Sequence, residues 1–213
     1  MTKTDTRERL IDVARELFLK QGYAATGIAQ ILREAGVNSG SLYYFFPTKE
    51  DLLLAVLQSY KQLLWPLVIQ PVFDRISDPI ERVFGILDGY RQMLMCTECD
   101  QGCPIGNLAI ELSESHPNAR RLIAENFTGW SKAIETCLAE AQERLGAGVN
   151  PESLAVFVLT TMEGAVMLAR AYRSLRPYDA AITQLRDYFD RIIAEGTSWP
   201  VPKRGTRSRR ERG

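Results

Sequence analysis

The sequence is poor in histidine and cysteine and has no excess of charge of either sign. Its 213 residues include one histidine, four cysteines, and 26 basic side chains against 26 acidic ones. It contains no nucleophile motif and no phosphate-binding glycine loop. We therefore expect no enzymatic activity and no cofactor. The balanced charge also argues against a general basic coating for nucleic acid.

Long apolar runs are missing as well. No stretch approaches the roughly 18 consecutive apolar residues that indicate a membrane-spanning helix, and the opening MTKTDTRERL lacks the apolar core of a secretory signal. We expect a cytoplasmic protein with no membrane partner, in which structural disulfides are not expected. Apolar residues recur at helical spacing and no strand pattern is evident, so the sequence predicts an all-α fold.

The most informative stretch runs from Thr26 to Lys49. The hydroxyl of Thr26 can cap a short helix, and Gly36 can end that helix because glycine tolerates the left-handed backbone conformation. A second short helix follows from Gly40 to Phe45. Pro47 closes it, because the residue before a proline is pushed out of helical geometry. Two short helices joined by a tight turn predict a helix-turn-helix.

The surface of the second helix carries the candidate DNA contacts. Its small, polar start lets backbone N–H groups and hydroxyls approach a phosphate or a base edge. The tyrosines that follow can bond a phosphate and pack on a thymine methyl group. Lys49 adds a cation at the start of the next helix, where a bound phosphate would also suit the helix dipole. The expected DNA contacts are Thr26, Asn38, Ser39, Gly40, Ser41, Tyr43, Tyr44 and Lys49.

A resemblance to a known family rests on Thr26, the A-G-V turn at 35–37, the S-G-S-L-Y-Y-F-F run at 39–46 and T-K-E at 48–50. Together these features resemble the DNA-binding domain of the TetR family of transcriptional repressors. The match extends upstream through Ala14, Leu17, Phe18 and the Gly22-Tyr23 pair. The family usually has histidine where this sequence has Phe45, a difference that removes one possible polar contact.

The resemblance implies three parts in the chain. These are an N-terminal three-helix helix-turn-helix DNA-binding domain at 1–48, a larger helical-bundle ligand-binding and dimerisation domain at 49–200, and a basic, disordered tail at 201–213. The first helix is expected to run to Gln21. The segment G-C-P-I-G-N-L-A at 102–109 resembles a run in the effector domain of one TetR subgroup.

Helical spacing and capping residues predict the helices of the body. A long helix starts near Lys49 and is expected to break or kink at Pro66 and Pro71. Gly102, Pro104 and Gly106 predict a non-helical break. Further helices are predicted to start at Pro79 and to run from Asn118 to Leu145, from Pro151 to Arg173 and from Asp179 to Glu195.

The resemblance implies a homodimer that binds operator DNA and is released by a small-molecule effector. The last two helices are the candidate dimer interface, because amphipathic helices packed on their two-fold copies form a four-helix arrangement. The helix from Lys49 is expected to transmit the movement. Glu163, a charge amid apolar residues, could select a cationic or hydroxyl group or simply face water. The candidate walls of the effector pocket are Trp65, Phe84, Tyr90, Met93, Phe127, Trp130, Thr160, Met162, Glu163 and Tyr172.

Three cysteines, Cys96, Cys99 and Cys103, follow a C-x2-C-x3-C spacing. Three thiolates can bind zinc or form a disulfide on oxidation, which leaves open an alternative function as a redox, electrophile or metal sensor on the same DNA-binding scaffold. Glu98 and Asp100 are expected to raise the thiol pKa values and so to disfavour thiolates. The simpler interpretation treats the buried thiols as small apolar residues, and no metal site is assigned.

Overall fold

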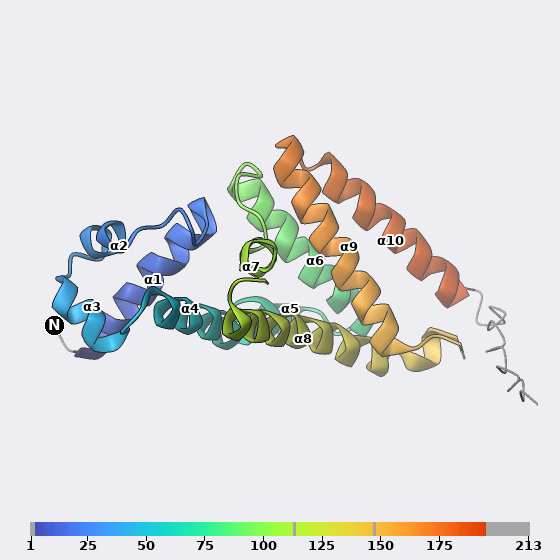
Figure 1. Ribbon diagram of the computed structural model, residues 1–213. Coiled ribbons are helices and arrows are strands. Elements are labelled where there is room, and N and C mark those ends of the chain that lie inside the picture. The colour runs from blue at the N-terminus through green and yellow to red at the C-terminus, as the bar shows by residue number, and fades with distance from the viewer. Residues whose placement is uncertain (1–2, 113, 147, 195–213) are drawn as a thin grey trace, which may run out of the picture.

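The computed structural model describes residues 3–112, 114–146 and 148–194, which fold into packed helices (Figure 1). The expected all-α fold is confirmed. The first three helices form a head at one end, the fourth helix leads out of it, and the remaining helices form a larger body. The elements in order are α1 (Lys3–Gln21), α2 (Ile28–Ala35), α3 (Ser39–Phe45), α4 (Lys49–Leu64), the π-helix η1 (Trp65–Ile69), α5 (Gln70–Arg75), α6 (Pro79–Cys96), α7 (Pro104–Leu112), α8 (Pro117–Glu140), the 3-10 turn η2 (Gln142–Arg144), α9 (Pro151–Tyr172) and α10 (Arg176–Ala194).

The head is organised around α1, which packs against α2, α3 and α4. Its buried core includes Leu10 and Phe18 from α1, Ile31 from α2 and Leu42 from α3. Gly36 ends α2 in the left-handed conformation, with φ of 61°, and its N–H donates to carbonyls of the preceding turn. This confirms the predicted helix stop and fixes the angle at which α3 leaves α2.

The predicted cap of α2 is wrong. Gly27 occupies the N-cap position and forms no side-chain hydrogen bond there. The Thr26 hydroxyl instead donates to the Gly22 carbonyl at 2.6 Å, and Thr26 is fully buried. A buried hydroxyl needs such a partner, so Thr26 holds the turn between α1 and α2 together from the inside.

Of the predicted break or kink at Pro66 and Pro71, a break does not occur. Helical geometry continues from α4 through η1 into α5, and each proline lies at the first or second position of its own segment. A proline within a continuous helix lacks the N–H that would bond the preceding turn, and its ring crowds the carbonyl there. The chain absorbs Pro66 by widening to a π turn, in which the Gln70 N–H donates to the Trp65 carbonyl.

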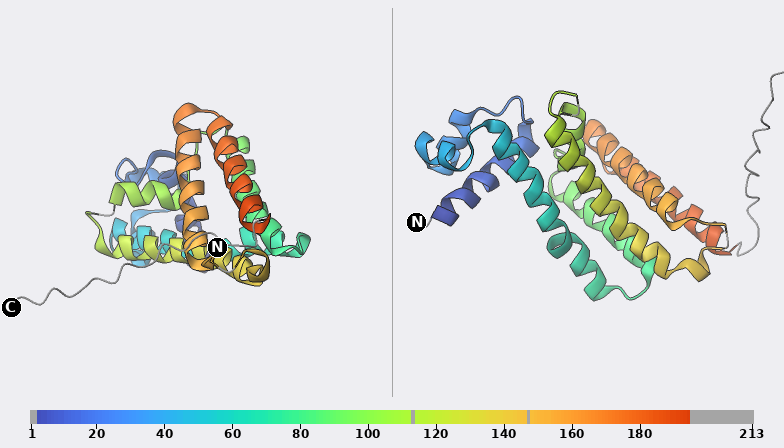
Figure 2. Two further views of the ribbon diagram at one scale, coloured as in Figure 1. Left: turned by 90° about the vertical axis from the view of Figure 1, so that its right-hand side faces the viewer. Right: turned by 60° about the horizontal axis from the view of Figure 1, so that its bottom comes forward.

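The body is built around α8, which packs against α4, α6, α7 and α9 (Figure 2). Asp78 caps α6 by accepting from the N–H groups of Ile80 and Glu81, and Asn150 caps α9 by accepting from Ser153. These caps confirm the predicted starts at Pro79 and Pro151. The structure corrects other bounds: α8 ends at Glu140 and a short 3-10 turn follows it, α10 begins at Arg176, and Pro104 opens α7 with Gly106 inside it.

Two stretches of the described chain, Lys49–Arg75 and Pro151–Tyr172, are long and apolar enough to cross a membrane by length and composition alone. In this structure both lie in the body, where α4 and α9 pack along α8 and α9 also packs against α10. A helix that packs against several neighbours in a folded protein can have the same composition, although only 28% and 39% of the two apolar windows are buried here.

The predicted domain boundary falls at the start of α4. This helix packs against α1 in the head and against α8 in the body, so it contributes to both cores, and the division after residue 48 stays a prediction. The predicted basic tail at 201–213 and the last part of the predicted body domain lie outside the described residues.

One buried amide ties α4 to α8 and gives a stability prediction. Asn126 is buried, and its Nδ2 donates to the Leu57 carbonyl of α4 at 3.1 Å and to the Leu122 carbonyl at 2.9 Å. We expect Asn126→Ala to lower the free energy of unfolding by about 1–3 kcal/mol, because it removes both hydrogen bonds and leaves a small void. Urea unfolding measures the loss. Asn118→Ala, an exposed change on the same helix, should stay within about 0.5 kcal/mol, and equal effects would contradict the assignment.

Candidate nucleic-acid interface and body cavities

The exposed face of α3 carries most of the predicted DNA contacts. Asn38 caps the helix, because its Oδ1 accepts from the Ser41 N–H at 2.8 Å. Leu42 is fully buried and anchors the opposite side. Tyr43 and Tyr44 point outward, with exposed fractions of 52% and 66%. The helix therefore presents a small polar start followed by two accessible rings.

Ser39 and Gly40 are exposed beside this cap, and Ser41 is half-buried. Six of the eight predicted contacts, from Asn38 to Tyr44 without Leu42, thus lie on one short helix and its cap. Phe45, at the position where the resembling family usually has histidine, is half-buried and packs edge-on against Tyr44, with ring centroids 4.9 Å apart. It supports an exposed tyrosine instead of offering a polar atom.

Lys49 and Thr26 are placed differently. Thr26 is fully buried, so the structure contradicts its prediction as a DNA contact. Lys49 Nζ donates to the Tyr23 carbonyl at 2.5 Å and lies 4.0 Å from the centre of the Tyr23 ring. Burial lowers the pKa of Lys49, and the Glu111 carboxylate opposes that shift. Lys49 thus has one of its donors engaged in the turn that follows α1.

The start of α4 does not need an added anion, contrary to the prediction. Thr48 and Asp51 form a reciprocal capping box, and Glu50 and Asp51 place two acidic groups in the first turn. Both features complement the positive end of the helix dipole. The helix dipole therefore gives no reason to expect a phosphate at Lys49. The remaining reason is the positive charge of the Lys49 ammonium group.

Glu111 of α7 joins the body to the head. Its carboxylate accepts from the N–H groups of Tyr23 and Ala24 at 2.9 and 2.6 Å. Gly22 precedes this turn with φ of 87°, and a Cβ atom there would lie 3.1 Å from Glu111 Oε2. The Tyr23 ring also packs edge-on against His116, with centroids 5.3 Å apart. Sequence reasoning missed Glu111 because no local pattern signals a contact between residues so far apart in the chain.

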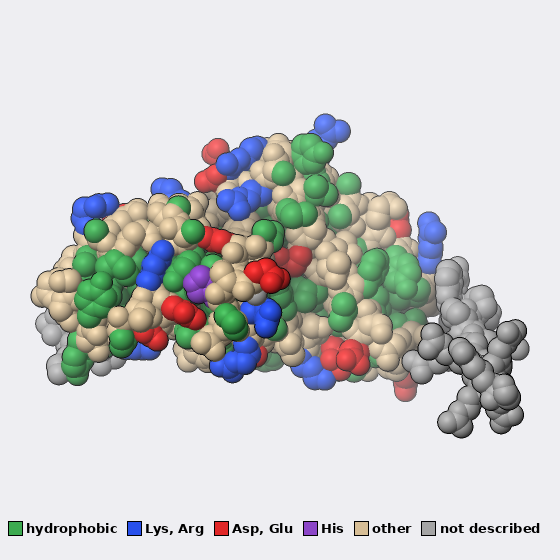
Figure 3. Space-filling model, viewed as in Figure 1, with side chains coloured by type: hydrophobic (Ala, Val, Ile, Leu, Met, Phe, Trp, Pro, Cys, Tyr) green, Lys and Arg blue, Asp and Glu red, His purple; other side chains and the backbone are tan. Residues whose placement is uncertain are grey.

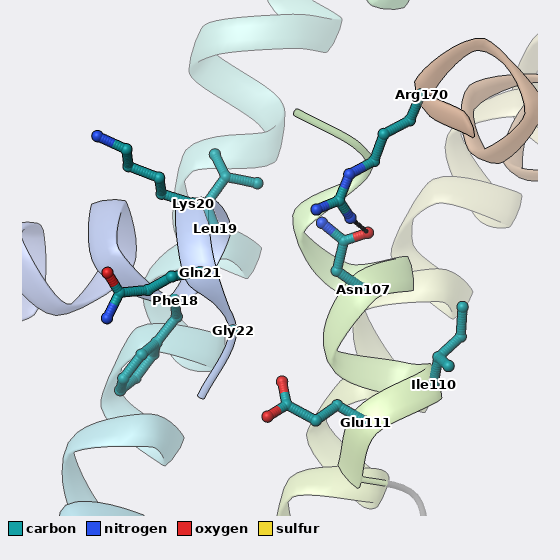
Figure 4. A pocket seen from close by; sticks show the side chains of 9 residues that line it. All are labelled: Phe18, Leu19, Lys20, Gln21, Gly22, Asn107, Ile110, Glu111 and Arg170. Atoms are coloured by element: carbon teal, nitrogen blue, oxygen red, sulfur yellow. Dashed lines mark hydrogen bonds between the residues drawn. The ribbon is translucent and has the colours of Figure 1, made fainter. Parts of the chain in front are cut away.

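A groove of about 270 Å³ runs along this junction between α1 and α7 (Figure 4). Glu111 points across it toward Gly22 at the end of α1. Asn107, one turn earlier on α7, accepts from Arg170 of α9 at 3.0 Å. The helix α7 therefore lines the groove and contacts both the head, through Glu111, and α9, through Asn107.

Two cavities lie in the body, and together they contain six of the predicted wall residues. The first has a volume of about 430 Å³ between α4, α6, α7 and α8, and includes Tyr90, Met93 and Trp130. The second, which we call the α9 cavity, has a volume of about 530 Å³ between α7, α8 and α9. Its walls include the predicted residues Phe127, Thr160 and Glu163.

The other four predicted wall residues line neither cavity. Trp65 is half exposed, and its Nε1 donates to Gln70 at 2.8 Å. Tyr172 is 70% exposed at the end of α9. Phe84 packs edge-on against Phe189 with centroids 5.2 Å apart, and Met162 is fully buried. Residue type alone predicted apolar character, but it could not separate core and surface positions from cavity walls.

All four cysteines are free, and only Cys96 is exposed. Burial is the main cause that raises the pKa values of the Cys99 and Cys103 thiols, while Arg173 opposes the shift at Cys99. The predicted cause, Glu98 and Asp100, is therefore wrong. Cys103 Sγ accepts from the Gly106 N–H at 3.4 Å and lies 4.0 Å from the Tyr90 hydroxyl. Within residues 3–112, 114–146 and 148–194, no group of three or more histidine, cysteine, aspartate or glutamate side chains could hold a metal ion.

The last two helices expose apolar side chains away from the core. Phe157 and Tyr188 pack edge-on against each other across α9 and α10, with centroids 5.6 Å apart, and both rings remain accessible. Further exposed apolar residues of α9 are Val156, Met167 and Leu168.

On the face shown in Figure 3, basic and acidic side chains are interspersed over the head and the body.

Comparisons with known proteins match both parts of the chain. Residues 10–56 match the family model for bacterial regulatory proteins of the tetR family, and residues 79–185 match the model for a tetracyclin repressor-like, C-terminal domain. The chain is 29% identical to the HTH-type transcriptional repressor DhaR of Mycobacterium sp. (strain GP1), over 86% of this chain and 91% of that protein. It is 31% identical to the HTH-type transcriptional regulator LmrA of Bacillus subtilis (strain 168), over 83% and 93%.

Solved structures show the same fold. The regulatory protein TetR from Rhodobacter sphaeroides superposes with a TM-score of 0.77 at 25% identity, over 87% of this chain and 97% of that one. A TetR transcriptional regulator from Chloroflexus aurantiacus gives a TM-score of 0.74 at 29% identity, over 88% and 96%. Because its head and its body both match, and because a relative at 31% identity spans most of its length, this chain belongs to the TetR family of helix-turn-helix transcriptional regulators, non-enzymatic DNA-binding proteins that dimerise through their C-terminal domain.

Proposed function

We propose that this protein is a cytoplasmic repressor that holds operator DNA as a homodimer and releases it when a small molecule binds the body. One arrangement carries the proposal. The helix α3 exposes Tyr43 and Tyr44 on the head, and the turn between α1 and α2 of the same head is hydrogen-bonded to Glu111 of the body. A ligand-controlled DNA-binding protein requires a DNA-contacting surface, here the exposed face of α3, that is connected to a body with cavities for a ligand.

In this proposal α3 enters the major groove. Its polar cap brings backbone N–H groups and hydroxyls to phosphates and base edges, and the two exposed tyrosines add ring contacts. Lys49 uses one of its three N–H donors on the Tyr23 carbonyl, so the others are left for a phosphate. A two-fold dimer repeats the arrangement at a spacing of about 34–36 Å along the duplex.

We assign the dimer interface to α9 and α10. These helices pack against each other and leave Phe157, Tyr188 and neighbouring apolar side chains exposed. Burying these side chains against a second copy would stabilise the pair by the hydrophobic effect.

The switch works through the two elements that touch both head and body. The helix α4 packs on α1 and α8, and Glu111 fixes the turn after α1 to α7. An effector that binds more tightly to dimers with one spacing of the two heads shifts the population toward that spacing. The coupling free energy between effector binding and DNA binding is typically about 1–3 kcal/mol.

The alternative function, a sensor based on Cys96, Cys99 and Cys103, has less support. A reactive thiol is accessible and has a lowered pKa, whereas Cys99 and Cys103 are buried and their pKa values are raised. Cys96 is exposed, but the other two thiols of the cluster are buried, so an oxidant reaches one thiol of the three directly.

The first prediction concerns the reading surface. An operator is first selected from random duplexes. Tyr43→Ala and Tyr44→Ala should then each weaken operator binding by about 1–3 kcal/mol and weaken the binding of bulk DNA by less. Fluorescence anisotropy with specific and scrambled duplexes measures this. Tyr172→Ala removes an equally accessible ring at the far end of α9 and should leave operator affinity unchanged. Unaltered affinity in both α3 variants would refute the docking.

The second prediction concerns Lys49. If its ammonium contacts a phosphate, Lys49→Ala should lower the slope of log affinity against log salt by about one unit, because one fewer counterion is released. Lys132→Ala removes an exposed body lysine that pairs with Glu135 and should leave the slope unchanged. The same slope in the Lys49 variant and the parent would restrict Lys49 to its contact with Tyr23.

The third prediction concerns the attachment of the head. Glu111→Ala removes the acceptor of two N–H groups, and a hydrogen bond to a charged group contributes about 1.5–3 kcal/mol. We expect the amide protons of Tyr23 and Ala24 to exchange about tenfold faster or more. Hydrogen exchange read by NMR measures this without knowledge of the effector. Glu114→Ala, an exposed change nearby, serves as the control; protection unaffected by loss of the Glu111 carboxylate would show that it does not hold the head.

A further inference from the structure

Glu163 lines the α9 cavity, and one of its carboxylate oxygens has no hydrogen-bond partner among the described residues. Glu163 Oε1 is buried and accepts no hydrogen bond within the described part of the chain. Its other oxygen lies against Gly106, where a Cβ atom would approach Oε2 to 2.5 Å. A larger residue at this point of α7 would displace the Glu163 carboxylate from its present position.

A second polar side chain in the same cavity is also incompletely bonded. Asn107 Oδ1 accepts from Arg170 at 3.0 Å, but its Nδ2 is buried and has no partner among the described residues. A Cβ atom on Gly102 would come within 2.8 Å of Asn107 Oδ1. The two glycines thus leave space for the two side chains that carry the unpaired acceptor and the unpaired donor.

The remaining walls of the α9 cavity are mostly apolar. They include Phe127 of α8, Ile110 of α7, and Leu159, Val166 and Met167 of α9. Burial raises the pKa of Glu163, and the neighbouring Cys103 thiol opposes part of that shift. None of the ion pairs in the described chain includes Glu163, and Arg170 is directed to Asn107. The carboxylate therefore lacks a counter-charge in an apolar setting, where an incoming cation would gain most.

We propose that the α9 cavity binds an apolar amine, whose ammonium group donates to Glu163 Oε1 while an acceptor atom of the same ligand receives the Asn107 N–H. This inference rests on the proposed function, since it names the chemical class of the effector. It also gives the ligand a route to the head: Gly106 and Asn107 belong to α7, which carries Glu111 one turn beyond Asn107.

The test uses three matched probes on the full-length dimer: 4-phenoxybutylamine, 4-phenoxybutanol and 4-phenoxybutyrate. They share a ring, an ether oxygen and four further carbons, and they differ in the end group, which is an ammonium, a hydroxyl or a carboxylate. By calorimetry near pH 7.5, the amine should bind about tenfold tighter than the alcohol or more, because only the amine brings a positive charge to the Glu163 carboxylate. The acid should bind weakest, because its own carboxylate is repelled by Glu163.

Glu163→Gln keeps the shape and an acceptor oxygen but removes the charge. In this variant the amine and the alcohol should bind within about threefold of each other, whereas Glu152→Gln, an exposed change on the same helix, should retain the full preference. Lowering the pH toward the raised pKa of Glu163 should shrink the preference in the parent protein, because the carboxylate becomes protonated while the amine stays charged.

Three results would overturn the inference: equal binding of amine and alcohol by the parent, an undiminished preference in Glu163→Gln, or no saturable binding of any probe. Operator binding is measured on the same preparations, which separates the two claims. A dimer that still selects its operator but shows no amine preference would refute the ligand class alone. A dimer with no preference for any duplex sequence would refute the proposed function itself.

Discussion

The carboxylate of Glu111 connects the two halves of the molecule, and the rest of the arrangement depends on that connection. It reaches from α7 to the N–H groups of Tyr23 and Ala24, which have no helical partner because α1 has just ended. Unpaired N–H groups beyond a helix need an acceptor from elsewhere, and here the acceptor comes from the body. The orientation of the reading head is thus set partly by a helix that is remote from it in the chain.

The short helix α7 lies between the head and the cavities for reasons visible in its sequence. Pro104 is its first residue, and Gly106 leaves space for the Glu163 carboxylate. Asn107 accepts a hydrogen bond from Arg170 of α9, and Glu111 accepts hydrogen bonds from the head. A helix of nine residues has little intrinsic stability, so its position is determined by these contacts and by the buried Leu108. Elements of this kind move between two arrangements more readily than long, continuously packed helices such as α8.

The sequence predicted those features that depend on neighbours in the chain. Asp78 and Asn150 cap helices as expected, Gly36 ends α2, and α3 exposes its tyrosines. Tertiary contacts decided the rest. Thr26 has the chemistry of a cap, but its hydroxyl bonds Gly22 in the interior. The Glu111 contact joins residues that no short-range pattern relates, and choosing cavity walls among apolar residues requires the packing itself.

The unpaired atoms of the α9 cavity would be unfavourable in a protein selected for stability alone. Burying a carboxylate or an amide group without full hydrogen bonding costs free energy, and filling the space with apolar side chains would remove that cost. Gly102 and Gly106 leave the space that the Asn107 and Glu163 side chains occupy, since a Cβ atom at either glycine would come within 3.0 Å of one of them. Local losses of this kind are concentrated at binding sites, because the missing partner is supplied by the ligand.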